Sequence, residues 1–89
     1  MTKIPRYDAR RDSNEAEIVE ALKAVGAGVI RLDEFDLLVA FRGNYYAFEV
    51  KTPEGELSDK QLKFINEWPG SIYIVRSADE ALRYIGAID

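Results

Sequence analysis

Hydrophobic residues near the start of the chain recur at the spacing of an α-helix. One face of this helix would carry Ile18, Val19, Leu22 and Val25. Gly26 follows them and is a natural stop. We expect the helix to begin near Asp12 or Ser13, because either side chain can cap the first turn.

Three short apolar runs then predict strands at 28–32, 35–41 and 45–51. The second and third strands join through Gly43-Asn44, which suits a type II′ hairpin turn because glycine comes first. Both of these strands carry apolar residues on both faces. We therefore expect helices to cover both sides of the sheet.

The rest of the chain predicts a helix, a strand and another helix. A polar loop at 52–57 precedes a helix at 58–68, and a buried strand follows at 72–76. Ser77 and Glu80 form the capping-box pattern that opens a last helix at 78–85. The order α-β-β-β-α-β-α, with a parallel crossover into the fourth strand, predicts an α/β fold. Its centre would be a mixed four-stranded sheet flanked by helices.

Composition narrows the chemistry that the chain can perform. Its 89 residues make one domain, and no apolar run is long enough to cross a bilayer. The absence of cysteine excludes disulfides and thiolate metal sites, and the absence of histidine removes the usual general base and the commonest zinc ligand. Any metal site must use oxygen ligands, which favours Mg²⁺ or Mn²⁺.

Charge is distributed unevenly along the chain. The net charge of −4 argues against nucleic acid as a partner. However, residues 1–11 carry +3, whereas residues 12–89 hold eight basic and fifteen acidic side chains. The basic residues of this N-terminal arm are Lys3, Arg6, Arg10 and Arg11. The arm is consistent with a phosphate contact and, alternatively, with a solvated tail.

Pairing the predicted hairpin brings three charged residues to one face of the sheet. Asp36 would face Lys51, and Leu38 would face Glu49. Asp36 and Glu49 would then be diagonal neighbours, with Cα atoms roughly 7–8 Å apart, so both carboxylates could reach one cation. Alternatively, Asp36 and Lys51 form a cross-strand salt bridge. Glu49 is the strongest candidate, because a charge in a strand that is apolar on both faces is costly without a purpose.

Two helices add one polar candidate each. Glu15 begins the inward-facing stripe of the first helix, where a carboxylate needs a partner or a metal. It is equally consistent with the third residue of a capping box opened by Asp12. Gln61 shares the inward stripe of the second helix with Phe64, yet it also lies three residues after Ser58, as in a capping box.

These elements together resemble the signature of PD-(D/E)XK nucleases. An acidic residue opens a strand, a hairpin follows, and the next strand ends in Glu49-Val50-Lys51. The surrounding sequence is similar to the small stand-alone VRR-NUC domains of phages, which are similar to archaeal Holliday-junction resolvases. The similarity runs from about residue 10 to residue 85 and includes the helix of Glu15, the strand Asp36-Leu37-Leu38-Val39, and Leu57-Ser58-Asp59-Lys60-Gln61 followed by Trp68.

The resemblance implies a restriction-endonuclease-like core and a single nuclease domain at 12–89. It further implies a Mg²⁺-dependent endonuclease that hydrolyses phosphodiester bonds of branched or structured DNA, including four-way junctions. Mn²⁺ would substitute for Mg²⁺, and the protein would act as a homodimer in the cytoplasm of a bacterial or phage-infected cell.

The same resemblance assigns roles to individual residues. The metal ligands would be Asp36, Glu49, the backbone carbonyl of Val50, and Glu15 through a bound water or a second ion. Lys51 would position or deprotonate the nucleophilic water. Gln61 would orient Lys51 or that water.

Two departures from the family pattern keep other functions open. Phe35 stands where the family usually has proline, and the short acidic link Asp33-Glu34 replaces a glycine-rich, often basic loop. One alternative is a catalytically degenerate nuclease fold that binds nucleic acid or protein. Another is a structural interaction module in which the acidic cluster is a salt-bridged face.

Overall fold

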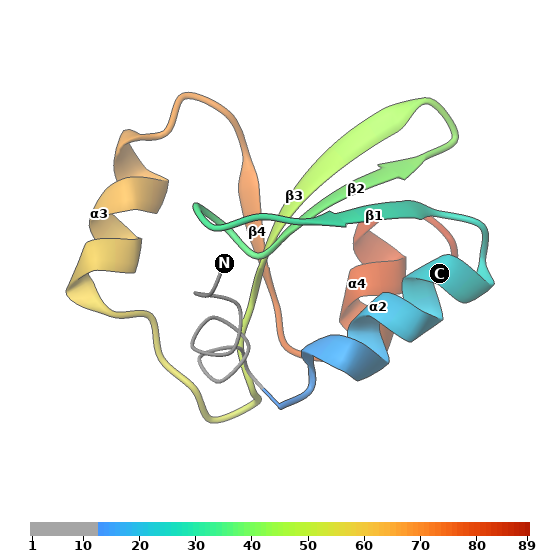
Figure 1. Cartoon of the computed structure of the whole chain (residues 1–89), viewed down its shortest axis with the longest axis horizontal. Helices are drawn as coiled ribbons and strands as arrows, with labels where there is room; N and C mark the ends of the chain where they lie inside the picture. Colours follow the sequence, from blue (N-terminus) through green and yellow to red (C-terminus); the bar gives the residue numbers. More distant parts are fainter. Residues whose placement is uncertain (1–12) are drawn as a thin grey trace, which may run out of the picture.

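The computed structural model of the chain describes residues 13–89, which form a four-stranded mixed sheet flanked by helices (Figure 1). The elements are α2 (Glu15–Ala24), β1 (Gly28–Arg31), β2 (Leu37–Phe41), β3 (Asn44–Val50), α3 (Asp59–Glu67), β4 (Ile72–Val75) and α4 (Ala78–Tyr84). The strand order is β1-β2-β3-β4. Pairing is antiparallel except between β3 and β4, which run parallel. The predicted α/β class and element order are confirmed, and the basic arm at 1–11 lies outside the described residues.

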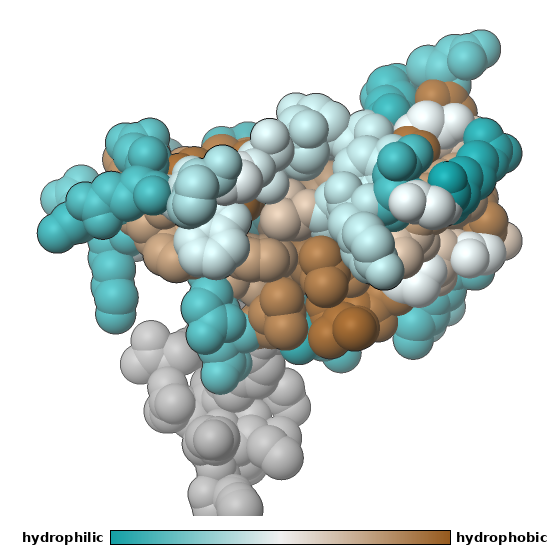
Figure 2. Space-filling view, turned by 90° about the horizontal axis from the view of Figure 1, so that it is seen from above, coloured by the Kyte–Doolittle hydropathy of each residue, from teal (hydrophilic) through white to brown (hydrophobic). Residues whose placement is uncertain are grey.

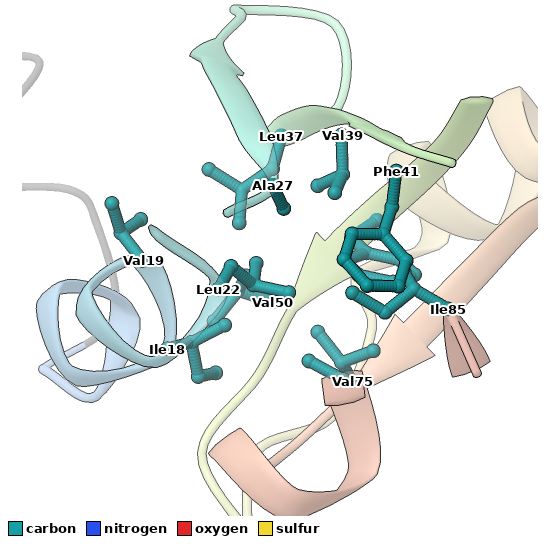
Figure 3. Close-up of a cluster of buried hydrophobic side chains, with 12 residues drawn as sticks. Ile18, Val19, Leu22, Ala27, Leu37, Val39, Phe41, Val50, Val75 and Ile85 are labelled. Atoms are coloured by element: carbon teal, nitrogen blue, oxygen red, sulfur yellow. The ribbon is translucent and has the colours of Figure 1, made fainter. Parts of the chain in front are cut away.

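The hydrophobic core lies between one face of the sheet and the helices α2 and α4 (Figures 1 and 3). Alternate residues of β2 and β3 point into it, so that Leu37, Val39 and Phe48 have no exposed surface. The cluster consists of Ile18, Val19, Leu22, Ala27, Leu37, Val39, Phe41, Phe48, Val50, Val75, Ala81 and Ile85. In residues 13–89, no helix combines the length and the apolar character needed to cross a bilayer.

The opposite face of the sheet is only partly covered. The strand pairing places Ile30, Leu38, Ala47 and Ile72 in one row across the four strands, and Ile30 is 57% exposed. Helix α3 has no buried residue. Seen from above, hydrophobic side chains gather in the middle of the molecular surface, with hydrophilic side chains over both ends (Figure 2). The expected coverage of both faces is therefore complete only on the side of α2 and α4.

The two C-terminal helices begin at serine caps, as predicted. At α3 the full capping box forms: Ser58 Oγ accepts from the Gln61 N–H at 3.1 Å, and Gln61 Oε1 accepts from the Ser58 N–H at 2.9 Å. At α4 only half of it forms. Ser77 Oγ accepts from the Glu80 N–H at 3.1 Å, but Glu80 Oε1 accepts from the Arg76 N–H at 2.7 Å.

Helix α2 begins later than the sequence predicted. Asn14 occupies the N-cap position without a side-chain cap hydrogen bond, and Glu15 is the first helical residue. The predicted cap at Ser13 is therefore wrong, and Asp12 lies outside the described residues. Since Glu15 is not the third helical residue, a capping box does not explain it.

The turn between β2 and β3 also differs from the prediction. Phe41 pairs with Asn44, so the turn residues are Arg42 and Gly43, with φ of 51° and 84°. Two positive φ angles are typical of a type I′ turn, which replaces the predicted type II′ turn.

This turn moves the hairpin register by two residues. Leu38 pairs with Ala47 instead of Glu49, and Asp36 does not face Lys51. Side chains alternate with a period of two, so a shift of two keeps each one on its predicted face.

Candidate active site

Asp36 lies immediately before β2 and is fixed at both its backbone and its side chain. Its carbonyl accepts from the Leu32 N–H at 3.0 Å, which closes the turn between β1 and β2. Its Oδ2 accepts from the Val50 N–H at 2.7 Å, where β3 ends. The hydrogen bond to Val50 therefore ties the start of β2 to the end of β3.

The observed register places Asp36 and Glu49 closer than the sequence predicted. Continuing the pairing by one step beyond Leu37 and Phe48 sets Asp36 directly opposite Glu49. Directly opposite residues have Cβ atoms roughly 4.5–5.5 Å apart, whereas diagonal neighbours are farther apart. Leu37 and Phe48 point into the core, so Asp36 and Glu49 share the other face of the sheet.

Glu49 is a buried carboxylate with a side-chain amide beside it. Only 5% of Glu49 is exposed, and its Oε2 accepts from Nε2 of Gln61 at 2.9 Å. The other end of the Gln61 amide accepts from Ser58 in the capping box. Gln61 therefore has both of the roles that the sequence offered: it completes the capping box, and its side chain points toward the site.

Asp36, Glu49 and Gln61 line one pocket of about 350 Å³. Its other lining residues are Asp33, Glu34, Lys60 and Phe64. The pocket therefore combines four carboxylates with one amide and one ammonium group. A cation is the ligand that such an excess of carboxylate oxygen favours.

The pocket also includes Lys60, Asp33 and Glu34, which the sequence does not predict as site residues. Lys60 precedes Phe64 by one helical turn, so the two share a face of α3. The four-residue spacing from Phe64 is the sequence feature from which the position of Lys60 beside the pocket could have been predicted. From the sequence, Asp33 and Glu34 are a short acidic link that departs from the family pattern and adds negative charge near the site, and the structure places both in the lining of the pocket.

Lys51 lies outside this pocket. It follows β3, where its N–H donates to the Val75 carbonyl at 3.0 Å and its own carbonyl accepts from Asn14 Nδ2 at 3.1 Å. The observed register does not place Lys51 opposite Asp36, so the cross-strand pairing behind the salt-bridge alternative is wrong, and the salt bridge itself stays a prediction.

Glu15 is buried at a different place from the pocket. Its side chain is 3% exposed, and its Oε2 lies 3.0 Å from Nε of Arg31, whose side chain is 49% exposed. A buried carboxylate was expected to need a partner or a metal, and Arg31 of β1 is such a partner. The structure does not bring Glu15 to the pocket of Asp36 and Glu49, and its role as a metal ligand stays a prediction.

The loop between β3 and α3 is held by a single guanidinium group. Nη1 of Arg76 donates to the carbonyls of Thr52 at 2.9 Å and Gly55 at 2.6 Å. This loop ends at the Ser58 cap, which in turn fixes Gln61. Arg76 therefore stabilises the segment that delivers Gln61 to Glu49.

The donor set of the pocket fits a hard cation. Within the described residues, no group of three or more metal-binding side chains is arranged around a common point. Mg²⁺ does not require one, because proteins usually bind it through one or two carboxylates together with waters and substrate phosphates. Asp36 and Glu49 supply such a pair.

The chain matches no protein-family model, no curated protein and no solved structure. The pocket and the motif resemblance are therefore the features that bear on its function.

Proposed function

We propose that the chain is a Mg²⁺-dependent endonuclease of the PD-(D/E)XK, VRR-NUC type that hydrolyses phosphodiester bonds in branched or structured DNA. The observation that carries this proposal is the pairing of Asp36 and Glu49 in one pocket, with Gln61 bonded to Glu49. The mixed sheet supports a restriction-endonuclease-like core, since β2, β3 and α3 hold these residues in the order that the motif requires.

Asp36 and Glu49 would hold the metal ion, with the Val50 carbonyl as a further oxygen ligand. When bound, Mg²⁺ lowers the pKa of water and offsets charge on the phosphate that is attacked. The Val50 N–H fixes the Asp36 carboxylate, and the Gln61 amide fixes that of Glu49. Each bond uses one oxygen of its carboxylate, so the orientation of both groups is set before substrate binds.

Two lysines would bind the phosphate and act on the attacking water. Lys60 lies in the pocket and would contact a phosphate oxygen as it enters. Lys51, two residues after Glu49, would position or deprotonate the attacking water. The four carboxylates of the pocket repel a phosphate, and a cation held by Asp36 and Glu49 would reduce that repulsion.

A catalytically degenerate nuclease fold that binds nucleic acid or protein is the second candidate. It is favoured by Asp33 and Glu34, which add negative charge to the pocket that the phosphate must enter. The position of Lys51 outside the pocket favours it too.

The test is a cleavage assay on linear, flapped and four-way DNA with Mg²⁺, with Mn²⁺ and with EDTA. We expect metal-dependent cleavage of the branched substrates by the full chain, and none by Glu49→Gln. Glu17→Gln, an exposed position on α2, is the matched control and should cleave like the wild type. Binding of DNA without cleavage under any metal condition would contradict the proposed nuclease activity and favour the catalytically degenerate fold. Sedimentation of the same sample measures whether the protein is a homodimer.

A further inference from the structure

A stacked aromatic pair lies at the C-terminal end of helix α3, formed by Phe64 and the C-cap residue Trp68. The ring centroids of Phe64 and Trp68 lie 5.4 Å apart, with 26° between the ring planes. Trp68 is 45% exposed. A Cβ atom built on Gly70 would lie only 3.0 Å from Trp68 Nε1, so the Gly70 backbone lies against the edge of the indole ring. The orientation of Trp68 is thus fixed by Phe64 and Gly70 while much of its surface stays exposed.

This aromatic pair continues a row that begins inside the pocket of Asp36 and Glu49. Lys60 and Phe64 line that pocket, and Trp68 stacks on Phe64. The three positions are four residues apart, so they follow one face of the helix at intervals of about 6 Å. A cationic group inside the pocket is therefore followed by two aromatic rings that lead out of it.

We propose that this row binds an unpaired nucleotide of single-stranded DNA beside the phosphate to be cleaved, with Lys60 at a backbone phosphate and Trp68 stacked on the base. This inference rests on the proposed nuclease function and narrows its substrate to DNA with unpaired nucleotides at the cleavage site, such as a flap or a gap. Exposed aromatic rings bind bases whose faces are free, and bases inside a duplex already stack on each other.

The charges of the pocket favour one strand over two. Lys60 offers a positive contact on the α3 side, whereas Asp33 and Glu34 would repel the backbone of a second strand. The pocket volume of about 350 Å³ is at the lower end for sites that hold small ligands, which suits one nucleotide and not a duplex groove.

The fluorescence of Trp68 tests this directly, because Trp68 is the only tryptophan in the chain. The full chain is titrated with a short oligothymidylate in Ca²⁺, and with a duplex of the same length. We expect saturable quenching by the single strand and clearly weaker quenching by the duplex. Absence of quenching by the single strand, or equal quenching by both, would overturn the inference.

A variant pair gives a second test. Trp68→Leu should weaken binding of the labelled single strand by about tenfold in fluorescence anisotropy, the loss expected when one base loses its stacking partner. Leu62→Ala, at an apolar position of α3 that is 43% exposed, should bind like the wild type. Melting temperatures of both variants check that the fold is intact. Equal affinity of Trp68→Leu and the wild type would also overturn the inference.

The two assays separate this inference from the proposed nuclease function. Quenching by the single strand without any metal-dependent cleavage would support the nucleotide-binding site and contradict the proposed nuclease activity. Metal-dependent cleavage without quenching would support the nuclease activity and contradict the nucleotide-binding site.

Discussion

Gln61 donates from Nε2 to Oε2 of Glu49 at 2.9 Å, and this bond connects α3 to the buried carboxylate at the end of β3. No residue of α3 is buried, so apolar packing contributes little to the position of this helix. The position of Gln61 is instead set by the Ser58 cap and by the loop that Arg76 holds. The candidate site therefore depends on polar contacts, of which the Ser58 cap is local in sequence and the contacts of Arg76 and Glu49 join distant segments.

Changing Gln61 to Glu should place two carboxylates within contact distance. We expect at least a tenfold loss of cleavage rate, because Glu49 loses the Gln61 donor and is repelled by the new carboxylate. In EDTA, the free energy of unfolding should fall by about 1–3 kcal/mol, the cost of a buried acceptor that loses its partner. The cap at Ser58 is kept, since Glu can accept the same N–H.

The matched control for this change is Asn66→Asp, which makes the same amide-to-acid change at an exposed position of α3. It should leave both the cleavage rate and the urea midpoint close to wild type. A Gln61→Glu protein that cleaves at the wild-type rate would remove Gln61 from the site.

The sequence predicted the faces of the hairpin correctly but not its register. Side chains alternate between the two faces of a strand, and counting outward from the predicted turn placed Asp36 and Glu49 on the same face. This alternation does not determine the turn, because shifting the pairing by two residues preserves every face. Gly43-Asn44 suited a type II′ turn, whereas the structure uses Arg42 at a positive φ, a conformation that the sequence pattern gives no reason to expect for arginine.

The type I′ turn predicts a specific loss of stability. Gly43 has φ of 84°, where a side chain is strained, so Gly43→Ala should lower the free energy of unfolding by about 1–2 kcal/mol. Gly28→Ala is the control, because its Cβ would meet Ala40 Cβ at an ordinary 3.9 Å in a strand. Urea unfolding of the two variants measures the difference. Equal stability of the two would contradict the assigned turn.

The surroundings of individual charged residues were harder to predict than the fold. Glu15 was placed correctly on the inward face of its helix, but its partner Arg31 lies on another element, and helical periodicity does not reveal contacts between elements. Lys60 reaches the pocket because the Ser58 cap and the preceding loop set the rotation of α3. The periodicity of the sequence therefore predicted neither the contact of Glu15 with Arg31 nor the position of Lys60 in the pocket.

The basic arm at 1–11 lies outside the described residues, so its prediction comes from the sequence alone. If its cations contact phosphates, deleting residues 1–11 should weaken DNA binding and flatten the slope of affinity against salt concentration. The fold should persist, since the core cluster lies within residues 18–85. Anisotropy at several salt concentrations measures both effects. An unchanged slope would show that the arm makes no phosphate contact.

Neutralising Asp36 should not destabilise the metal-free protein. In Asp36→Asn, the amide oxygen can still accept from the Val50 N–H, while the negative charge opposite Glu49 is removed. We therefore expect the free energy of unfolding in EDTA to stay unchanged or to rise. If Asp36 served as a buried salt-bridge partner, the same change would cost about 3–5 kcal/mol. Urea unfolding in EDTA shows whether the change raises or lowers the free energy of unfolding.

Calorimetric titration with Mn²⁺ tests most directly the central claim that Asp36 and Glu49 form a metal site. We predict that the wild type binds Mn²⁺ and that Asp36→Asn and Glu49→Gln each lose at least tenfold in affinity. Asp79→Asn, at an exposed position on α4, is the control and should bind like the wild type. Wild-type Mn²⁺ affinity in both Asp36→Asn and Glu49→Gln, or no binding by the wild type itself, would contradict the claim.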